Sequence, residues 1–372
     1  MFGWQQSSGL KVLSRRISKF TSLRTFQSVR TRSITSFTRL SENNTSPPAR
    51  TRNFKAFHIV TQQERTFSSS RTMAAPPATN LTDAVVAAMR TLFPEELADS
   101  AWDNTGLLLG QAPTPKSENE TGGTVLLTND LTSAVVDEAL EEGANMIICY
   151  HPVIFRPLKS LTTKDPMQTL LLRLAAERIS VYCPHTAMDA ASGGLNDWLC
   201  DILLDGDHQA NRTVVQPIAR PLPEGQQYTG YGRTVELARP VNLQTLLKRL
   251  SAGIGDQRYM MVAVPPTLKN LTKTQEISKV AVCAGSGADV LKDTDAQVLV
   301  TGEMAHHYAL RHTQLGQIVV TVFHSNSERK YLETRLKPML EVELETTAYG
   351  DTRVIVSKAD RDPYEVIDVW GL

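Results

Sequence analysis

The sequence has few cysteines, and none of them forms a close pair. The four thiols, Cys149, Cys183, Cys200 and Cys283, are scattered along 372 residues and include no C-x-x-C motif. This spacing argues against a disulfide scaffold and against a zinc site built from cysteines. Cys149, Cys183 and Cys283 lie inside apolar runs, where a thiol behaves as a small core side chain. A reducing compartment fits this pattern.

Long apolar runs are also missing. No stretch reaches the roughly 18 consecutive apolar residues that cross a bilayer, so we expect no transmembrane helix and no membrane partner. Beyond residue 72 the chain has no excess of positive charge, because it carries 26 Lys and Arg against 37 Asp and Glu. A nucleic-acid-binding surface needs a basic face. Direct binding of nucleic acid is therefore disfavoured.

Acidic residues are nearly absent from the first 72 residues, which hold 13 Lys and Arg but only Glu42 and Glu64. With 23 Ser and Thr and no apolar core of a secretory signal, segment 1–72 is typical of a mitochondrial targeting segment, and we expect it to be disordered. The stretch 65–68 resembles a matrix-protease site, so a mature matrix protein would begin between Ser68 and Met73. Met73 also offers an internal start, which would give an additional cytoplasmic form. A basic tail without a targeting role and a misassigned upstream start are the alternatives.

From about Thr79 the chain alternates short apolar strands with helices, which predicts α/β layers with at least partly parallel sheets. The predicted helices span 83–93, 133–142, 167–178, 194–204, 243–250, 303–311 and 325–336. The predicted strands span 124–128, 145–150, 179–183, 259–264, 280–283, 297–300, 318–322 and 353–356. Residues 205–233 are rich in proline and glycine and predict a crossing between two domains.

Three histidines stand at the ends of apolar strands. His151 follows ANMIICY, His185 follows ISVYCP and His324 follows IVVTVF. The carboxyl ends of strands are where open α/β sheets place ligand sites. A single such histidine is more often a satisfied polar residue than a ligand. Three of them, two with a carboxylate four residues further on, favour a metal site.

Two of these histidines share their spacing to a carboxylate. His324 and Glu328 stand four residues apart at the start of a predicted helix, so their side chains lie on one face and reach one cation together. His185 and Asp189 have the same spacing, but Pro184 and the glycines that follow suggest a loop, where spacing alone proves little. Nitrogen and oxygen ligands without thiolates suit zinc, iron or manganese.

The other histidines have weaker claims to a site. His58 and His208 lie in segments that we expect to be solvated, and His312 ends a predicted helix, where a cation complements the carbonyl groups. His306 and His307 are adjacent on a predicted helix and therefore point about 100° apart. We expect one of them to face a cleft and the other to lie on the surface.

Two glycine-containing turns were also weighed for function. Gly285-Ser286-Gly287 follows an apolar strand and could offer backbone N–H groups to an anion. It lacks the third glycine and the downstream acid of a dinucleotide site, so a tight turn is the favoured interpretation. The stretch 102–106 (WDNTG) predicts a turn held by a buried Trp102.

Seven segments together resemble the NGG-one-interacting factor three family, whose bacterial members are known as GTP cyclohydrolase I type 2. The segments are WDNTGLLLG (102–110), YHPVIFRPLKSL (150–161), PHTAMDAASGGLNDWL (184–199), GYGR (230–233), CAGSGADVL (283–291), TGEMAHHYAL (301–310) and HSNSER (324–329). They run in family order over about 90–372. ADRDP at 359–363 and the tyrosine of YHP are more similar to eukaryotic than to bacterial members.

The resemblance implies a two-domain α/β subunit in which a second α/β domain is inserted into the first. The metal-binding domain would comprise 79–225 and 315–372, with the metal site at its strand ends, and the inserted domain would comprise 226–314. The resemblance also implies a homo-oligomer, a toroidal hexamer whose central cavity the metal site faces.

The family's metal ligands fall on His151, Asp189, His324 and Glu328, and would hold one or two divalent ions per subunit. The first histidine of the family's HHP motif is Tyr150 here. A phenol must lose a proton before it binds a metal, so we expect one firmly bound ion and a second that binds weakly. His185 would lie behind the ligands, where it orients Asp189 or holds water.

Two classes of function follow from these residues and this resemblance. One is a metal-dependent hydrolase with a small, nucleotide-like substrate, whose cation would polarise the attacked group. No separate general base stands out, so no catalytic residue is assigned. The other is a non-enzymatic, metal-stabilised scaffold that binds protein partners, such as a transcription coactivator. Metal storage or delivery is a third. The interpretation carried forward is a metal-binding, hydrolase-like protein whose substrate the sequence leaves open.

Overall fold

The computed structural model describes residues 80–112, 122–206, 210–223, 225–226, 228–268 and 275–371. The predicted targeting segment with its cleavage site, Met73, His58 and His208 lie outside the described residues. The described residues belong to one compact unit, Met73–Leu372. None of the helices in these ranges is long and apolar enough to cross a membrane.

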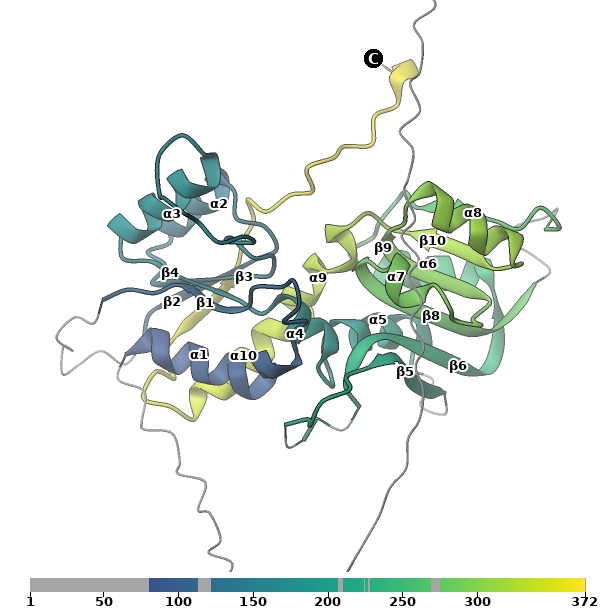
Figure 1. The fold of residues 1–372 in the computed structure, drawn as a ribbon, viewed down its shortest axis with the longest axis horizontal. Coiled ribbons are helices and arrows are strands. Elements are labelled where there is room, and N and C mark those ends of the chain that lie inside the picture. The colour runs from purple at the N-terminus through teal and green to yellow at the C-terminus, as the bar shows by residue number, and fades with distance from the viewer. Residues whose placement is uncertain are drawn as a thin grey trace, which may run out of the picture. The chain divides into compact units, whose positions relative to one another are not determined.

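The first sheet has five strands in the order β1-β4-β3-β2-β11 (Figure 1). These are β1 (Gly106–Leu109), β2 (Thr124–Thr128), β3 (Met146–Cys149), β4 (Ser180–Cys183) and β11 (Arg353–Val356). β11, β2, β3 and β4 run parallel, and β1 is antiparallel to β4 at the edge.

Helices cover both faces of this sheet (Figure 1). Val125 and Leu127 of β2 share a core with α1 (Leu81–Leu92) and α10 (Lys337–Glu345). Leu126, between them, points the other way and shares a core with α2 (Ser133–Glu141) and α3 (Pro166–Ala176). A parallel strand that is buried on both faces needs apolar side chains at every position, which explains the continuous apolar runs of the sequence.

The second sheet has six strands in the order β5-β6-β8-β9-β10-β7. These are β5 (Asn211–Pro217), β6 (Gly230–Asn242), β7 (Met261–Ala263), β8 (Glu276–Ser286), β9 (Val298–Glu303) and β10 (Ile318–Thr321). β8, β9 and β10 are parallel, and the other three strands pair antiparallel. The helices of this part are α5 (Leu195–Leu204), α6 (Leu243–Gly253), α7 (Ala288–Leu291) and α8 (His306–Gln314).

The α/β fold with two sheets is confirmed, and the sheet topology adds where each strand pairs. β5 and β10 lie in segments 79–225 and 315–372 but form hydrogen bonds in the second sheet, which therefore draws its strands from residues 211–321. Segment 205–233 is also more than a crossing, because it contains β5 and the start of β6. Pro217 ends β5, and an edge strand tolerates proline because its outer N–H groups need no partner.

Two secondary-structure predictions near the predicted site were wrong. Residues 185–190, expected to be a loop, form helix α4 (His185–Ala190). The single helix expected over 325–336 is instead a 3-10 turn (Ser325–Ser327), α9 (Arg329–Tyr331) and a π-helical turn (Leu332–Leu336). α10 then continues the chain with Pro338 in its first turn, where proline removes no helical hydrogen bond.

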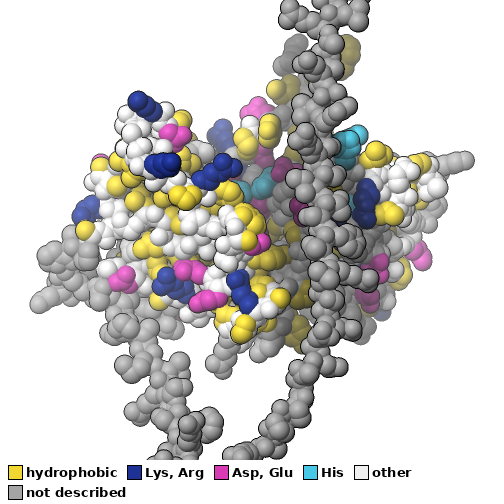
Figure 2. Space-filling model, viewed as in Figure 1, with side chains coloured by type: hydrophobic (Ala, Val, Ile, Leu, Met, Phe, Trp, Pro, Cys, Tyr) yellow, Lys and Arg dark blue, Asp and Glu magenta, His cyan; other side chains and the backbone are white. Residues whose placement is uncertain are grey.

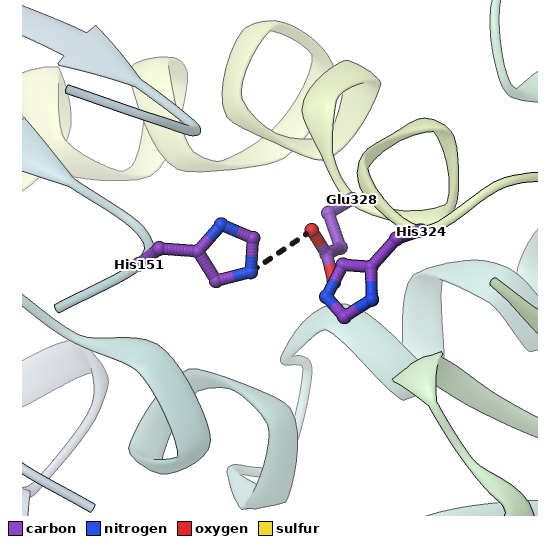
Figure 3. A group of neighbouring side chains, drawn as sticks. All are labelled: His151, His324 and Glu328. Atoms are coloured by element: carbon purple, nitrogen blue, oxygen red, sulfur yellow. Dashed lines mark ion pairs between the residues drawn. The ribbon is translucent and has the colours of Figure 1, made fainter. Parts of the chain in front are cut away.

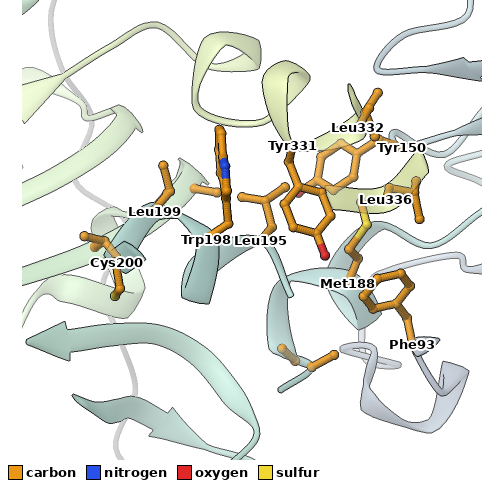
Figure 4. Packing of buried hydrophobic residues seen from close by; sticks show 14 of the residues in the cluster. Phe93, Tyr150, Met188, Leu195, Trp198, Leu199, Cys200, Tyr331, Leu332 and Leu336 are labelled. Atoms are coloured by element: carbon orange, nitrogen blue, oxygen red, sulfur yellow. The ribbon is translucent and has the colours of Figure 1, made fainter. Parts of the chain in front are cut away.

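One apolar core joins layers from both sheets. It includes Tyr182 of β4 and Val280 of β8 together with residues of α1, α5 and α10. The rings of Trp198 and Tyr331 meet at a centroid distance of 5.8 Å, and Figure 4 shows Tyr331 close to Met188 and Leu195. Since protein interiors are close-packed, this core holds the strand ends of the two sheets in place.

The segment after β11 is fastened to α2 by one carboxylate. Glu138 accepts hydrogen bonds from Ser357 Oγ at 2.5 Å and from the N–H groups of Lys358 at 2.8 Å and Ala359 at 3.2 Å. Partial burial raises the pKa of Glu138, but these hydrogen bonds outweigh it, so the pKa lies below its ordinary value. The ionised carboxylate therefore stabilises this part of the fold.

Candidate metal centre

Three of the four predicted ligands converge between the two sheets (Figure 3). His151 follows β3 of the first sheet, whereas His324 follows β10 of the second. Glu328 lies between the 3-10 turn and α9. One possible ligand atom from each residue lies within 4.8 Å of the other two. The expectation that His324 and Glu328 return to the sheet of His151 was wrong, because the site is shared between both sheets.

The carboxylate of Glu328 lies between the two imidazoles. Its Oε2 is 3.6 Å from Nε2 of His151, and its Oε1 is 3.4 Å from Nε2 of His324. Its side chain is only 1% exposed, and no Lys or Arg within the described ranges forms an ion pair with it. Burial raises the pKa of Glu328 well above its ordinary value, although a 3.0 Å hydrogen bond from Asn129 Nδ2 acts in the opposite direction.

This environment fits a divalent cation. A buried carboxylate without a cationic partner is costly, and a cation between the two Nε2 atoms would remove that cost. Two imidazoles and one carboxylate form a donor set that zinc and non-haem iron use in proteins. The His151–His324–Glu328 cluster could therefore hold a metal ion.

Each histidine of this cluster is oriented by an acidic residue that the sequence analysis missed. Nδ1 of His151 is 2.8 Å from Oδ1 of Asp130, and Nδ1 of His324 is 3.1 Å from Oε1 of Glu303. A carboxylate that accepts the Nδ1 proton leaves the Nε2 lone pair for a metal, and such partners are typical of metal-binding histidines. Burial raises the pKa of Asp130, but the hydrogen bond with His151 outweighs it, so the net shift is downward.

The two acids occupy equivalent places in the two sheets. Asp130 stands just after β2, next to β3 in the first sheet, and Glu303 ends β9, next to β10 in the second. Both acids therefore lie at the carboxyl end of a strand parallel to the one that leads to their histidine. Only the strand order makes this relation visible.

Asp189, the fourth predicted ligand, lies in the wall of the same pocket but outside the three-residue cluster. Its Oδ1 accepts a 2.7 Å hydrogen bond from the hydroxyl of Tyr150. Burial raises the pKa of Asp189 to about 6, and burial also raises the pKa of Tyr150 well above its ordinary value. The phenol therefore stays protonated and donates to the carboxylate. A ligand role for Asp189 stays a prediction.

His185 is held by an aspartate from the WDNTG segment. Its Nδ1 is 2.7 Å from Oδ1 of Asp103, whose Oδ2 accepts hydrogen bonds from the hydroxyl and, at 3.2 Å, the N–H of Thr186. Its ring meets the rings of Tyr150 and His151 at centroid distances of 5.4 and 5.6 Å. His185 thus lines the site beside the predicted ligands, with Asp103 as its partner.

The tryptophan of the same segment differs from the prediction. Trp102 is 51% exposed, so it does not staple the turn from inside. Its Nε1 donates a 2.9 Å hydrogen bond to Asp99 Oδ2, and its ring stands 5.9 Å from that of Phe155. A hydrogen bond from Asn104 Nδ2 to the carbonyl of Ile154 holds the turn instead.

The other histidines within the described ranges, His306, His307 and His312, do not line this pocket. His306 and His307 are both exposed at the start of α8 and lie outside the pocket at the cluster, and that one of them faces a cleft stays a prediction. His312 is fully buried, and its Nδ1 pairs with Gln317 Oε1 at 2.7 Å.

Gly285 lies directly beside Glu328 of the cluster. Its φ of +60° suits glycine, and a Cβ added there would lie 2.8 Å from Oε1 of Glu328. Its N–H donates to Ser327 Oγ at 2.9 Å, and the N–H of Gly287 donates to Thr301 Oγ1 at 3.0 Å. These N–H groups serve the fold, which favours the tight turn over an anion site.

Comparison with known proteins finds a matching family. The sequence model of Duf34/NIF3 (NGG1p interacting factor 3) matches residues 81–363. The chain is 41% identical to the Protein NIF3 homolog of Schizosaccharomyces pombe over 285 residues, which are 76% of this chain and 97% of that protein. It is 38% identical to NGG1-interacting factor 3 of Saccharomyces cerevisiae over 293 residues, with 76% and 96% covered.

A solved structure has the same fold. A hypothetical protein of Staphylococcus aureus superposes with a TM-score of 0.62 at 22% identity, and the match covers 78% of this chain and all of that one. At this identity the likeness supports the fold alone.

Proposed function

This chain belongs to the Duf34/NIF3 family, and from that premise we propose that it is a metal-dependent, hydrolase-like protein for a small-molecule substrate. The observation that carries the proposal is the buried Glu328 carboxylate between the Nε2 atoms of His151 and His324. A structural salt bridge would pair that carboxylate with Lys or Arg. Two imidazoles whose Nδ1 atoms face carboxylates are typical of metal-binding histidines.

The pocket above this cluster suits a small molecule. It encloses about 570 Å³ and is lined by residues of both sheets, among them Tyr150, Asp189, Asn196 and Tyr231. Small-molecule sites typically span about 300–1,000 Å³ and combine apolar walls with a few polar groups. In Figure 2 histidine and acidic side chains come to the surface next to hydrophobic ones.

The residues of the chain have separate tasks in this proposal. Asp130 and Glu303 keep the Nδ1 protons of the two histidines, so that both Nε2 atoms face inward. Tyr150 directs its proton to Asp189 and holds that carboxylate at the pocket wall. A bound divalent ion, zinc, iron or manganese, would supply Lewis-acid polarisation of a substrate group. Asp189 would be a further ligand or serve a second, weaker ion.

The test combines metal content with turnover. We expect purified protein to hold about one ion per subunit by mass spectrometry, and metal-loaded protein to turn over a member of a pooled set of nucleosides, nucleotides and phosphoesters. His324→Ala should lose both metal and turnover. His306→Ala replaces an exposed histidine outside the pocket and should change neither. Equal metal content in the two variants would reject the centre.

A protein-interaction scaffold is the second candidate, and one observation favours it. The C-terminal segment leaves the body of the described chain (Figure 1) and exposes Tyr364 by 82%, Val369 by 74% and Trp370 by 99%. Such exposed apolar surface marks interaction sites, and the Saccharomyces cerevisiae relative is named for an interaction with NGG1. Binding of a partner equally by wild type and His324→Ala, without any turnover, would favour the scaffold over the enzyme.

Assembly and location complete the proposal. We propose a homo-hexamer, for which analytical ultracentrifugation should give a mass of about six times the subunit mass of 41.1 kDa, less the targeting segment. We also propose a mitochondrial matrix protein. N-terminal sequencing of protein from mitochondria should begin between Ser68 and Met73, and an intact Met1 would contradict cleavage.

A further inference from the structure

The pocket above the His151–His324–Glu328 cluster has two features that metal binding does not use. One is a pair of exposed aromatic rings, and the other is a lining in which the carboxylates have no Lys or Arg beside them. Both bear on what the pocket binds. The inference drawn from them rests on the proposed function only in taking this pocket as the substrate site.

Trp102 is held in place beside Phe155 before any ligand arrives. Trp102 and Phe155 line the pocket and remain 51% and 49% exposed, with ring centroids 5.9 Å apart. Trp102 Nε1 is tied to Asp99, and the indole ring meets His185 edge-on at 5.7 Å. Large apolar side chains held rigidly at a pocket wall offer a stacking surface at little entropic cost.

The charged groups of the pocket are acidic. Four carboxylates line it, those of Asp99, Asp189, Asp289 and Glu328, and the described lining residues include no Lys or Arg. One divalent ion would offset two of these four negative charges. Cations close by are directed elsewhere. Arg156 lines a separate pocket, and Arg220 donates to the carbonyl of Ala98.

A phosphorylated substrate is poorly matched to this lining. Phosphate sites in proteins present Arg, Lys or free N–H groups at a helix or loop. Here the N–H groups of Gly285 and Gly287 donate to side chains of the protein. Among the described residues that line the pocket no Lys or Arg faces a phosphate, so its positive partner there would be the metal ion.

We infer that the pocket binds a flat aromatic ring compound that is neutral or positively charged, stacked against Trp102 and Phe155, in preference to a nucleotide or another phosphate ester. The ring of the ligand packs against the side chains of Trp102 and Phe155. The carboxylates of the lining repel anions and attract cations and hydrogen-bond donors. The part of the ligand nearest Glu328 then lies at the metal cluster.

Three indole compounds that share one ring and differ in charge test this inference. Tryptamine is a cation, indole-3-acetamide is neutral and indole-3-acetate is an anion at pH 7. Their binding to the full-length protein as purified is measured by calorimetry or ligand-observed NMR, with metal content determined in the same samples. We expect tryptamine and the acetamide to bind about tenfold more tightly than the acetate, and the gap to narrow in high salt.

Four variants locate the binding. Trp102→Leu should weaken tryptamine binding about tenfold, as expected for the loss of one stacking platform. Tyr259→Leu removes a 49% exposed aromatic ring that does not line this pocket and should leave binding unchanged. Phe155→Leu serves as a second probe if circular dichroism shows that Trp102→Leu does not fold. Asp289→Asn should reduce the difference in affinity between tryptamine and indole-3-acetate.

The opposite results overturn the inference. These are equal or tighter binding of indole-3-acetate, unchanged affinity in both aromatic variants, or no binding of tryptamine or the acetamide at about 10 mM, the weakest affinity worth assigning to a site. Metal content keeps the two proposals apart. Charge-selective ring binding without metal would sink the metal centre alone, whereas bound metal without ring selectivity would sink this inference alone.

Discussion

Replacing Glu328 with Gln tests the metal centre most directly, because it removes one charge and keeps the volume of the side chain. The carboxylate is 1% exposed and its oxygens lie 3.4 and 3.6 Å from the two Nε2 atoms. The amide oxygen of Gln can still accept the hydrogen bond from Asn129. The expected result is a fold that persists, metal-free protein at least as stable as wild type because a buried charge is gone, and a large loss of metal affinity.

The size of the effect follows from linkage. At a free metal concentration of about 100 times the dissociation constant, a bound ion stabilises the native state by about 2.7 kcal/mol. Loss of residues that only orient metal ligands weakens affinity about 10–100-fold, so loss of the ligand carboxylate should cost at least about 100-fold. At the same concentration, metal would then stabilise the variant by only about 0.4 kcal/mol. For a domain of this size the metal-induced rise in Tm should fall from about 5–10 °C to about 1 °C.

Thermal unfolding with and without zinc, and metal per subunit by mass spectrometry, measure this. Glu345→Gln at the exposed end of α10 is the matched control and should behave as wild type. Glu303→Gln removes the partner of His324 Nδ1. Its zinc-induced rise in Tm should lie between those of Glu328→Gln and wild type. The alternative role for Glu328 is that of a structural glutamate that binds no ion. An unchanged metal stoichiometry in Glu328→Gln, or a zinc-induced Tm rise equal to that of wild type, would refute the reasoning.

Three further predictions follow. Tyr150→His should supply an imidazole and raise zinc content from one ion towards two per subunit in calorimetric titrations of chelated protein; two tight, equal sites in wild type would contradict this. Gly285→Ala places a methyl group 2.8 Å from the site's glutamate oxygen and should abolish zinc binding. Gly143→Ala, at a similar φ of +64° but in open space, should cost only about 1–2 kcal/mol of backbone strain and keep its zinc, so equal zinc content in the two variants would refute the steric account. Glu138→Gln should lose about 1 kcal/mol of stability at pH 7. Because the folded pKa of Glu138 is lowered, this contribution is present above the unfolded pKa of about 4.3 and is lost as the pH falls through the folded pKa, so urea unfolding curves of variant and wild type should converge as the pH falls below the folded pKa. A constant difference across that range would exclude the carboxylate as the cause.

The metal cluster shows how far local spacing carries. The pair His324 and Glu328 was found from its i, i+4 spacing, yet the chain there forms a 3-10 turn rather than the expected continuous helix. The two side chains still converge, with Nε2 and Oε1 3.4 Å apart. His151 was found because it ends an apolar strand. Residue type and strand position were therefore sufficient for three of the residues that the structure brings together.

The partners of these residues were beyond the reach of the sequence. Asp130 and Glu303 each belong to a strand next to the one that leads to their histidine. Asp103 holds His185 across 82 positions of the chain. Nothing in the residues around an acid reveals which histidine it will face, since that depends on which strands are neighbours.

The sequence by itself determined the fold class and the positions of the parallel strands, because burial on both faces of a parallel strand requires an unbroken apolar run. It missed β1, β5 and β6, which pair antiparallel. It also determined that His151, His324 and Glu328 were worth bringing together. Only the tertiary structure decided that β10 pairs with β9 rather than joining the first sheet, and hence that the cluster lies between the two sheets. The physical reason is that a four-residue apolar strand offers the same hydrogen-bonding edge to either sheet, and the choice is made by packing with residues far away in the chain.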